Sequence, residues 1–338
     1  MKKYKVGIIG SGKVGRALSI ALTKQNYDVC LVCNNHSGIH IDNKCEFSMR
    51  GDLGDATCLV TTASSVSCLS DDLDVIIITT RSYDTINIIS DCMHKIKDSG
   101  CIVTIQNVFT IDKISKLIPS DKSVCAYLDI NCNSIKDSLY VTDFNGITLG
   151  IYDRFAYEKM EMVKEILSSI CEIHIAKDIV GFALGRNIIN GAISMLGAIS
   201  GLPLGEILAD KNGEYLFTKI ITEAVGVIKR FRINIVPYND KLDYYKFCED
   251  IKYRKSMLKL LKVNNKDVTS SALKDIQRGK KPELSYALGI IMEYGSKFKM
   301  DISYISVLYE IFKDIQDGKR EINKQLFYDE KITKLKGR

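Results

Sequence analysis

Long apolar segments are missing from this chain of 338 residues. No uninterrupted apolar run approaches the ~18 residues that a membrane-spanning helix requires, so we expect no membrane partner. The first four residues, Met1 to Tyr4, lead directly into a strand pattern and leave no room for a secretory signal. Hydrophobic residues make up 46% of the chain and charged residues 26%, which is typical of a soluble globular protein. We therefore expect a cytoplasmic protein.

Metal-binding patterns are also scarce. The four histidines do not share the spacing that places ligands on one element. Cys30 and Cys33 have the CxxC spacing, but they lie in a strand pattern, where residues three apart point to opposite faces. Eleven cysteines without a secretory signal indicate free thiols in a reducing compartment. We expect core thiols and no metal site.

The net charge of +6 is spread over the chain rather than concentrated. Local basic blocks occur at residues 252–262 and 331–338, and they are typical of solvated helix faces. A nucleic-acid patch would usually bring interleaved aromatic residues or a known binding fold. We expect no nucleic-acid partner. The surplus of positive charge does favour the steering of small anionic ligands.

Strand and helix patterns alternate in the first half of the chain. Short apolar strand patterns occupy residues 5–9, 28–33, 74–79 and 101–105, and helical patterns occupy residues 16–25 and 84–97. This alternation predicts an α/β fold with a doubly wound parallel sheet of the Rossmann type.

After about residue 176 the strand patterns stop. The long helical patterns that follow cover residues 178–200, 204–232, 242–261, 283–298 and 302–316. The length of the chain also favours two domains. We predict a dinucleotide-binding Rossmann domain over residues 1–176 and an all-helical substrate and dimerisation domain over residues 177–338, with a homodimer as the expected assembly.

A glycine-rich loop follows the first strand pattern and opens the first helix. We call it the glycine loop, and it consists of Gly10, Ser11, Gly12, Lys13, Val14 and Gly15. A GxGxxG segment between the strand and helix of a βαβ unit predicts a dinucleotide site. Gly10 would make the tight turn, Gly12 would let the pyrophosphate approach the backbone, and Gly15 would let the helix pack on the strand. The phosphates would then meet the N–H groups at the helix end.

The end of the second strand carries no acidic residue. Sites that prefer NAD usually have Asp or Glu there, bonded to the ribose hydroxyls, whereas this sequence continues from Cys33 with Asn34, Asn35, His36 and Ser37. A carboxylate would repel a 2′-phosphate, but Asn34 can donate a hydrogen bond to it. We therefore predict NADP(H) as the cofactor and Asn34 as one of its ligands, with NAD(H) as the alternative.

Two polar clusters stand out in the second half. Arg186, Asn190 and Ser194 are four residues apart and drift only ~40° per step around a helix, so they form a narrow polar stripe. Such a stripe faces water or a polar cleft, and its apolar flanks favour the cleft. Further along, Ser271 and Asp275 would share one face of a short helix, although composition alone also fits a capped turn.

These segments, in this order, resemble those of the ketopantoate reductase (2-dehydropantoate 2-reductase) family. Residues 78–83 are similar to an apolar strand followed by a cofactor-side lysine, and residues 105–107 to a strand that ends in an asparagine. Residues 186–194 resemble the catalytic helix, Lys-x-x-x-Asn-x-x-x-Asn. Residues 270–283 resemble the signature Ser-Ser-Met-x-x-Asp with a later Gly and Glu.

The resemblance implies reduction of a 2-oxo acid by hydride transfer from NADPH, with ketopantoate as the family's substrate in pantothenate biosynthesis. It implies a substrate site between the two domains, with Arg186 and Glu283 as catalytic residues. The implied substrate-binding residues are Asn107, Arg186, Asn190, Ser194 and Ser271. The implied cofactor-binding residues, besides the glycine loop and Asn34, are Arg81, Asn107 and Glu283.

Four positions depart from the family pattern. Arg186 replaces the catalytic lysine, Arg81 the cofactor-side lysine, Ser194 the second asparagine and Ala272 the methionine. A buried lysine can donate a proton near neutral pH, whereas arginine holds its protons. Arg186 could still stabilise an oxyanion or bind a carboxylate through two hydrogen bonds, with the proton coming from water or another group.

Three functions fit these residues. The first is the reduction of ketopantoate, the second is the reduction of a related 2-oxo acid whose carboxylate Arg186 holds, and the third is NADP(H) binding without catalysis. Product formation separates the first two from the third, and a screen of 2-oxo acids separates the first from the second.

Overall fold

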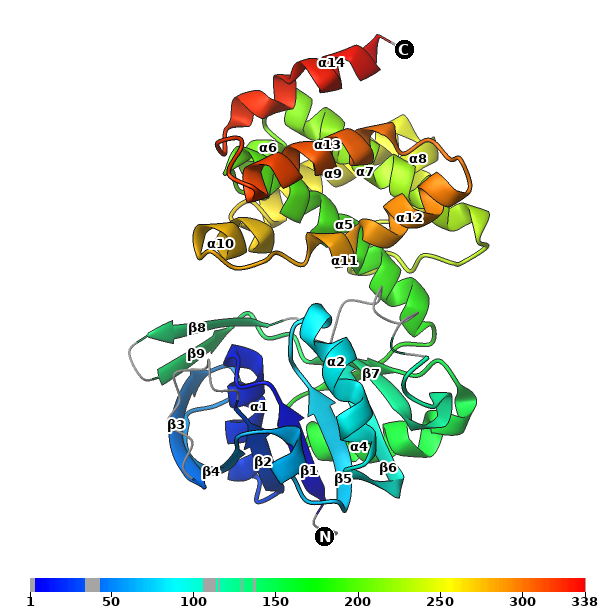
Figure 1. Ribbon diagram of the computed structural model, residues 1–338. Coiled ribbons are helices and arrows are strands. Elements are labelled where there is room, and N and C mark those ends of the chain that lie inside the picture. Colours follow the sequence, from blue (N-terminus) through cyan, green and yellow to red (C-terminus); the bar gives the residue numbers. More distant parts are fainter. Residues whose placement is uncertain are drawn as a thin grey trace. The chain divides into compact units, whose positions relative to one another are not determined.

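The computed structural model describes residues 4–33, 43–105, 114, 116–128, 130–135 and 138–337. The chain divides into two compact units, Met1–Ile179 and Val180–Arg338, each described here by itself. The first unit combines a sheet with helices and the second is helical (Figure 1). The predicted α/β fold class with a helical second part is confirmed.

One sheet organises the first unit, and its described strands follow the order β11-β10-β7-β6-β5-β1-β2-β4-β3-β9-β8. The strands are β1 (Lys5–Ile9), β2 (Asp28–Val32), β3 (Lys44–Gly51), β4 (Ala56–Ala63), β5 (Leu73–Ile78), β6 (Ile96–Ile105), β7 (Ser123–Leu128), β8 (Asn131–Ile135), β9 (Ser138–Thr142), β10 (Ile147–Gly150) and β11 (Ile173–Ile175). From β4 through β2, β1, β5 and β6 to β7, every neighbouring pair is parallel. This is the doubly wound order, in which ligands bind beyond the end of the central strand β1.

Helices cover both faces of the sheet. The described helical segments of this unit are α1 (Lys13–Lys24), α2 (Ser82–Met93), α4 (Tyr157–Ser168) and the short 3-10 helices η1 (Val66–Cys68), η3 (Ser120–Lys122) and η4 (Arg154–Ala156). Val6 and Ile8 pack in one core with α1 and α4, whereas Ile9 packs in a second core with α2. Cys30 and Cys33 likewise belong to opposite cores, because alternate strand residues point to opposite faces. All eleven cysteines are free thiols.

Beyond β4 the sheet continues past the side of α1. β3 pairs with β4 antiparallel and with β9 in parallel, and β9 forms an antiparallel hairpin with β8. Both strands of this hairpin contact α1 (Figure 1). The sequence did not predict β3, β8 or β9, because their mixed polar composition gives no continuous apolar run. It also did not predict β4, β7, β10 or β11.

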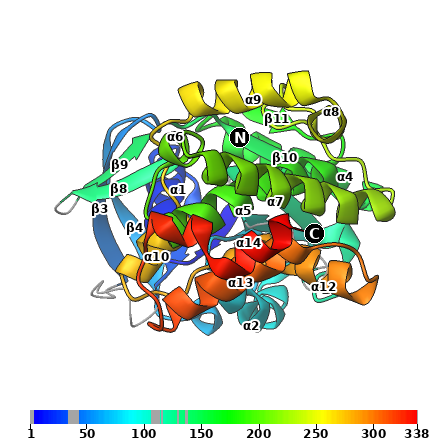
Figure 2. The ribbon, with the colours of Figure 1, turned by 90° about the horizontal axis from the view of Figure 1, so that it is seen from above.

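The second unit is built from helices. They are α5 (Ile179–Ser200), α6 (Leu204–Ile207), α7 (Lys211–Arg230), α8 (Tyr244–Glu249), α9 (Ile251–Asn264), α10 (Ser271–Gln277), α11 (Leu284–Ala287), α12 (Gly289–Lys297), α13 (Ser303–Gln316), the 3-10 helix η5 (Lys324–Tyr328) and α14 (Glu330–Lys336). Figure 2 shows α7 and α13 side by side, and the two helices pack together.

Three of the long helices predicted for this unit are wrong in extent. The pattern at residues 204–232 is two helices, because the Asp210 carboxylate accepts hydrogen bonds from the N–H groups of Asn212 and Gly213 and starts α7. Asp250 caps α9 in the same way and splits the pattern at residues 242–261. The third pattern is divided between α11 and α12.

Helix α5 meets the length and composition of a membrane span, and it is the only helix among the described residues that does so. Polar residues interrupt its apolar run, so counting uninterrupted apolar residues overlooked it. Of its most apolar window, 78% is buried inside the protein, which is the property of a core helix.

Candidate functional site

The glycine loop is shaped by close backbone contacts. Gly10 has a φ of 112°, a conformation that L side chains rarely adopt. A Cβ on Gly15 would lie 1.9 Å from the carbonyl oxygen of Gly10 and 2.7 Å from Oγ1 of Thr79. A Cβ on Gly12 would meet nothing within 4 Å. Local packing therefore requires glycine at positions 10 and 15, whereas Gly12 leaves open space in front of the helix.

Thr79 connects the glycine loop to the neighbouring strand β5. Its backbone N–H donates to the carbonyl oxygen of Ile9 at 2.9 Å, and its hydroxyl lies 3.0 Å from the carbonyl oxygens of Ile9 and Gly10. We did not single out Thr79 from the sequence, although a threonine directly after an apolar strand was the available signal. Arg81 follows two residues later, at the N-cap position of α2.

The first turn of α1 offers free space and donors for an anion. Gly12 is the N-cap residue, no side chain caps the turn, and the turn contains no acidic residue. The first N–H groups of a helix lack partners within the helix and lie at the positive end of its dipole. Together with the open space at Gly12, this geometry fits the pyrophosphate of a dinucleotide.

In the second unit, α5 carries one stripe that is not buried. Among residues 181–200, all are buried except Phe182, Arg186, Asn190 and Ser194, which recur every four residues. The three polar residues of the stripe are among the residues predicted to bind substrate. A single accessible stripe on a buried helix concentrates the polar chemistry of α5 along one line.

Aromatic rings hold the Arg186 guanidinium. Its Cζ lies 5.3 Å from the ring centroid of Phe182 and 5.7 Å from that of Tyr238. Nη2 also donates a hydrogen bond of 3.4 Å to Oδ1 of Asn239. Cation–π attraction to two rings orients the guanidinium without neutralising its charge. Arg186 can therefore bind a carboxylate or stabilise a developing oxyanion.

Two of the predicted residues meet between α5 and α10. The hydroxyls of Ser194 and Ser271 lie 3.3 Å apart. Their neighbour Ser270 is buried, donates to the Ser194 carbonyl oxygen at 2.8 Å and accepts from the Leu273 N–H at 3.0 Å. A Cβ on Gly197 would lie 2.6 Å from the Cβ of Ser270, so the glycine permits this close approach of the two helices.

The predicted site residues fall into two groups. The glycine loop and Arg81 belong to the first unit, and Arg186, Asn190, Ser194, Ser271 and Glu283 belong to the second. Glu283 is partly buried at the N-cap position of α11. Asn34 and Asn107 lie outside the described residues.

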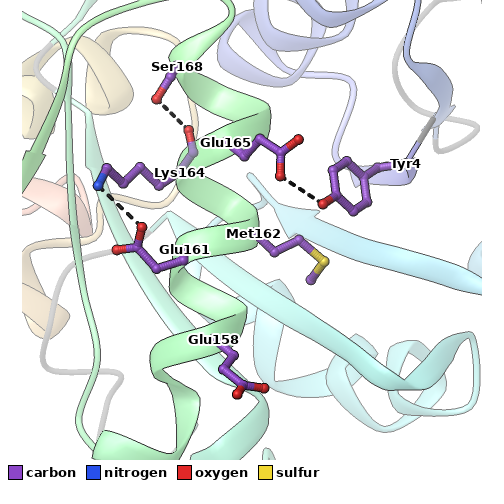
Figure 3. A pocket seen from close by; sticks show the side chains of 7 residues that line it. All are labelled: Tyr4, Glu158, Glu161, Met162, Lys164, Glu165 and Ser168. Carbon is purple, nitrogen blue, oxygen red and sulfur yellow. Dashed lines mark hydrogen bonds and ion pairs between the residues drawn. The ribbon is translucent and has the colours of Figure 1, made fainter. Parts of the chain in front are cut away.

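A cavity of about 430 Å³ in the first unit is lined by none of these residues (Figure 3). It is formed by Tyr4 and one side of α4, and three of its lining residues are glutamates. Tyr4 donates a 2.8 Å hydrogen bond to Oε2 of Glu165, and this contact raises the pKa of Tyr4 to about 12. An acidic lining does not suit a dinucleotide or an oxo acid, so this cavity is not the candidate site.

The chain is similar to known proteins along most of its length. Residues 6–154 match the family described as "Ketopantoate reductase PanE/ApbA", and residues 178–316 match "Ketopantoate reductase PanE/ApbA C terminal". The 2-dehydropantoate 2-reductase of Pyrococcus horikoshii is 27% identical over 314 residues, which are 91% of this chain and 96% of the relative.

Solved structures share the fold. A D-mandelate dehydrogenase in complex with NADH and anilino(oxo)acetate aligns with a TM-score of 0.76 at 15% identity, over 93% of this chain and 99% of that one. A dimeric ketopantoate reductase from Staphylococcus aureus aligns with a TM-score of 0.70 at 14% identity, over 94% and 100%. At such identities the likeness establishes the fold alone.

Proposed function

Because this chain belongs to the ketopantoate reductase family, we propose that it reduces 2-dehydropantoate to pantoate with NADPH, a step of pantothenate biosynthesis. It is an oxidoreductase that acts on a CH–OH group and uses a nicotinamide cofactor. The observation that carries the specific proposal is the accessible stripe of α5, which places Arg186, Asn190 and Ser194 in one line and Ser194 beside Ser271.

The reaction joins a hydride and a proton to the keto group of the substrate. NADPH, when bound, supplies the hydride to the keto carbon, and the keto oxygen takes a proton to become the hydroxyl. In our proposal the glycine loop binds the cofactor's phosphates, with Arg81, Asn34, Asn107 and Glu283 on the cofactor side. Asn107 also reaches the substrate.

Arg186 holds the charge that the substrate develops or carries. Its guanidinium can donate two parallel hydrogen bonds to the substrate carboxylate or stabilise the oxygen that becomes negative. It cannot usefully give up a proton, so the proton comes from water or another group. In the proposal, the amide of Asn190 and the hydroxyls of Ser194 and Ser271 bond the remaining polar groups of the substrate.

A second candidate is the reduction of a different 2-oxo acid. It is favoured by the two aromatic rings that orient Arg186, because a fixed guanidinium suits a carboxylate clamp better than proton transfer. A screen of 2-oxo acids, in which the loss of NADPH absorbance is measured, distinguishes the two candidates.

The solved structures similar to this chain include a dimeric ketopantoate reductase. We propose a homodimer here, which light scattering would measure.

The direct test is steady-state turnover with ketopantoate and NADPH. We expect turnover well above the background without enzyme, and a larger kcat/KM for ketopantoate than for other 2-oxo acids. Binding of NADPH without any turnover would refute catalysis, and faster turnover of another 2-oxo acid would move the proposal to the second candidate.

A further inference from the structure

Two basic side chains lie at the N-terminal end of α1. Lys13 and Arg16 are three residues apart, which places them on the same face of the helix. No acidic residue lies in the first turn. Positive charge near a helix N-terminus is unfavourable, because the helix dipole is positive there. This placement becomes favourable when an anion binds at the same end.

The guanidinium of Arg16 has an unsatisfied donor. Its Nε is buried and makes no hydrogen bond among the described residues. A buried N–H of a charged group without an acceptor is costly, and buried charges in proteins are normally paired. The Arg16 guanidinium therefore keeps a buried donor that no described residue satisfies.

The neighbours of Arg16 do not supply an anion. The positive charge of the guanidinium favours the thiolate forms of Cys33 and Cys132. Burial has the larger effect, so the pKa of both thiols is raised above its ordinary value. Both thiols therefore stay neutral near pH 7. The Cys132 thiol of β8 also lies 3.9 Å from the Lys13 carbonyl oxygen, so this end of α1 lies beside β8.

This location is where a dinucleotide places its adenosine ribose. Cys33 directly follows β2, and at the end of that strand the Val32 carbonyl oxygen accepts a 3.3 Å hydrogen bond from the Gly10 N–H of the glycine loop. On the other side, Lys13 Nζ lies 3.5 Å from Oδ1 of Asn133 in β8, the strand drawn beside α1 in Figure 1. In Rossmann folds the 2′ position of the ribose lies beside the end of the second strand.

We propose that Arg16, assisted by Lys13, binds the 2′-phosphate of NADP(H) and thereby selects against NAD(H). This inference rests on the proposed function only for the presence of a dinucleotide in the glycine loop. A phosphate can accept two hydrogen bonds from the guanidinium and pairs its charge. The 2′-hydroxyl of NAD(H) leaves that charge unpaired.

The test compares two small ligands that differ only in the 2′-phosphate, adenosine 2′,5′-bisphosphate and 5′-AMP. Calorimetry on the full chain gives the ratio of their dissociation constants. We expect the wild type to bind the bisphosphate at least about tenfold more tightly, since one charged hydrogen bond corresponds to about that factor. Arg16→Gln should remove about tenfold of the ratio, with the affinity for 5′-AMP unchanged within about twofold. Lys13→Gln should remove about threefold of the ratio.

Lys24→Gln is the matched control. It removes the same charge from the other end of α1, where Lys24 Nζ donates to the Asp55 carbonyl oxygen, and it should leave the ratio unchanged. A second variant, Arg16→Lys, keeps the charge but loses the planar fork, so an intermediate ratio supports direct contact. It also keeps the test decisive if circular dichroism shows that Arg16→Gln does not fold.

Three results would overturn the inference: equal binding of the two ligands by the wild type, a wild-type ratio in both Arg16 variants, or an equal loss in Lys24→Gln. The assay contains no oxo acid. A chain that fails to turn over ketopantoate but shows the expected ratios would therefore refute the proposed function and leave this inference standing.

Discussion

The two units build their parts of the candidate site in different ways. In the first unit the backbone forms the site. Gly10 and Gly15 have no side chain that would clash with their neighbours, and Gly12 has none that would fill the space for the phosphates. In the second unit, side chains form the site along one stripe of α5. A backbone site binds any ligand with the right phosphates, whereas a side-chain site changes its ligand when one residue changes. The comparison explains why the departures from the family pattern can alter the substrate without altering the fold.

The largest effect should come from the backbone side of this comparison. Gly15→Ala places a Cβ 1.9 Å from the Gly10 carbonyl oxygen, and neither backbone can move without opening the packing of α1 against β1. We expect a loss of at least about 4 kcal/mol in the free energy of unfolding, together with loss of nucleotide binding. Urea unfolding and NADPH fluorescence titration measure the two effects.

Gly12→Ala is the matched substitution. Its backbone has a φ of −64°, which alanine adopts easily, and its Cβ would meet nothing within 4 Å. We expect stability within about 0.5 kcal/mol of the wild type, with nucleotide affinity still lowered at least about tenfold, because the methyl group occupies the approach of the phosphates. Unchanged affinity would show that the phosphates do not lie at Gly12.

Substitution of Arg186 tests the part of the site that side chains form in the second unit. Arg186→Ala should lower kcat/KM by about 10²- to 10³-fold, the usual cost of losing one preorganised donor to a developing charge. The dissociation constant of NADPH should change little, because the glycine loop belongs to the other unit. Arg230→Ala, which removes an exposed arginine of α7, is the control and should leave kcat/KM unchanged.

Arg186→Lys distinguishes two roles for the same charge. If Arg186 holds a carboxylate through two hydrogen bonds, Arg186→Lys should lower kcat/KM by about tenfold and leave the dissociation constant of NADPH nearly unchanged. A gain in kcat would contradict the clamp, since it would mean that the site works better with a proton donor. A pH profile of kcat for this variant would then show the new ionisation.

A buried carboxylate gives the helical unit a dependence on pH. Glu223 of α7 accepts hydrogen bonds of 2.9 Å from the N–H groups of Tyr304 and Ile305 at the start of α13. Burial raises its pKa from 4.5 to about 7, with a smaller contribution from Asp301, and it outweighs the lowering by these bonds and by Lys219. Between pH 4.5 and 7 the unfolded chain loses this proton while the folded unit keeps it.

Stability from Glu223 is therefore full below pH 4.5 and is lost as the pH rises through 7. We expect a loss of about 2 kcal/mol, less than the full shift implies because the side chain keeps some contact with water. Urea unfolding at pH 5 and pH 8 would show it, and Glu223→Gln should flatten the difference. Glu293→Gln, an exposed control on α12, should not.

The sequence predicted the parts of the molecule whose signals are local. The strand, glycine loop and helix at residues 5–24 follow one another directly, so their pattern is readable without tertiary information. Helix ends were missed where the apolar period continues through Asp210 and Asp250, because a capping carboxylate is recognised only by the N–H groups it bonds.

The sequence also could not predict contacts between segments that lie far apart along the chain. Lys13 and Asn133 are 120 positions apart, and no periodicity connects an α-helix to a polar hairpin that joins the sheet at its far edge. Ser194 and Ser271 are 77 positions apart, and only the resemblance to a family placed both in one site. The charge balance of Arg16 could not be read either, since it depends on which groups fold around it.

The smallest effects should separate two adjacent serines of the helical unit. Ser270 is buried and caps α10, whereas Ser271 is exposed beside Ser194. Ser270→Ala should lower the free energy of unfolding by about 1 to 2 kcal/mol, because the Leu273 N–H and the Ser194 carbonyl oxygen lose a partner. Ser271→Ala should leave stability within about 0.5 kcal/mol and raise KM for the oxo acid by about three- to tenfold.

The division between supporting and binding residues holds in this turn only if each variant changes one quantity. Ser270→Ala must lower stability without raising KM, and Ser271→Ala must raise KM without lowering stability. If Ser271→Ala destabilises the chain while KM stays constant, then its hydroxyl supports α10 and does not bond a substrate. If Ser270→Ala raises KM at full stability, the cap itself lies in the site. In that case the division between supporting and binding residues, clear at Gly15 and Gly12, fails in the helical unit.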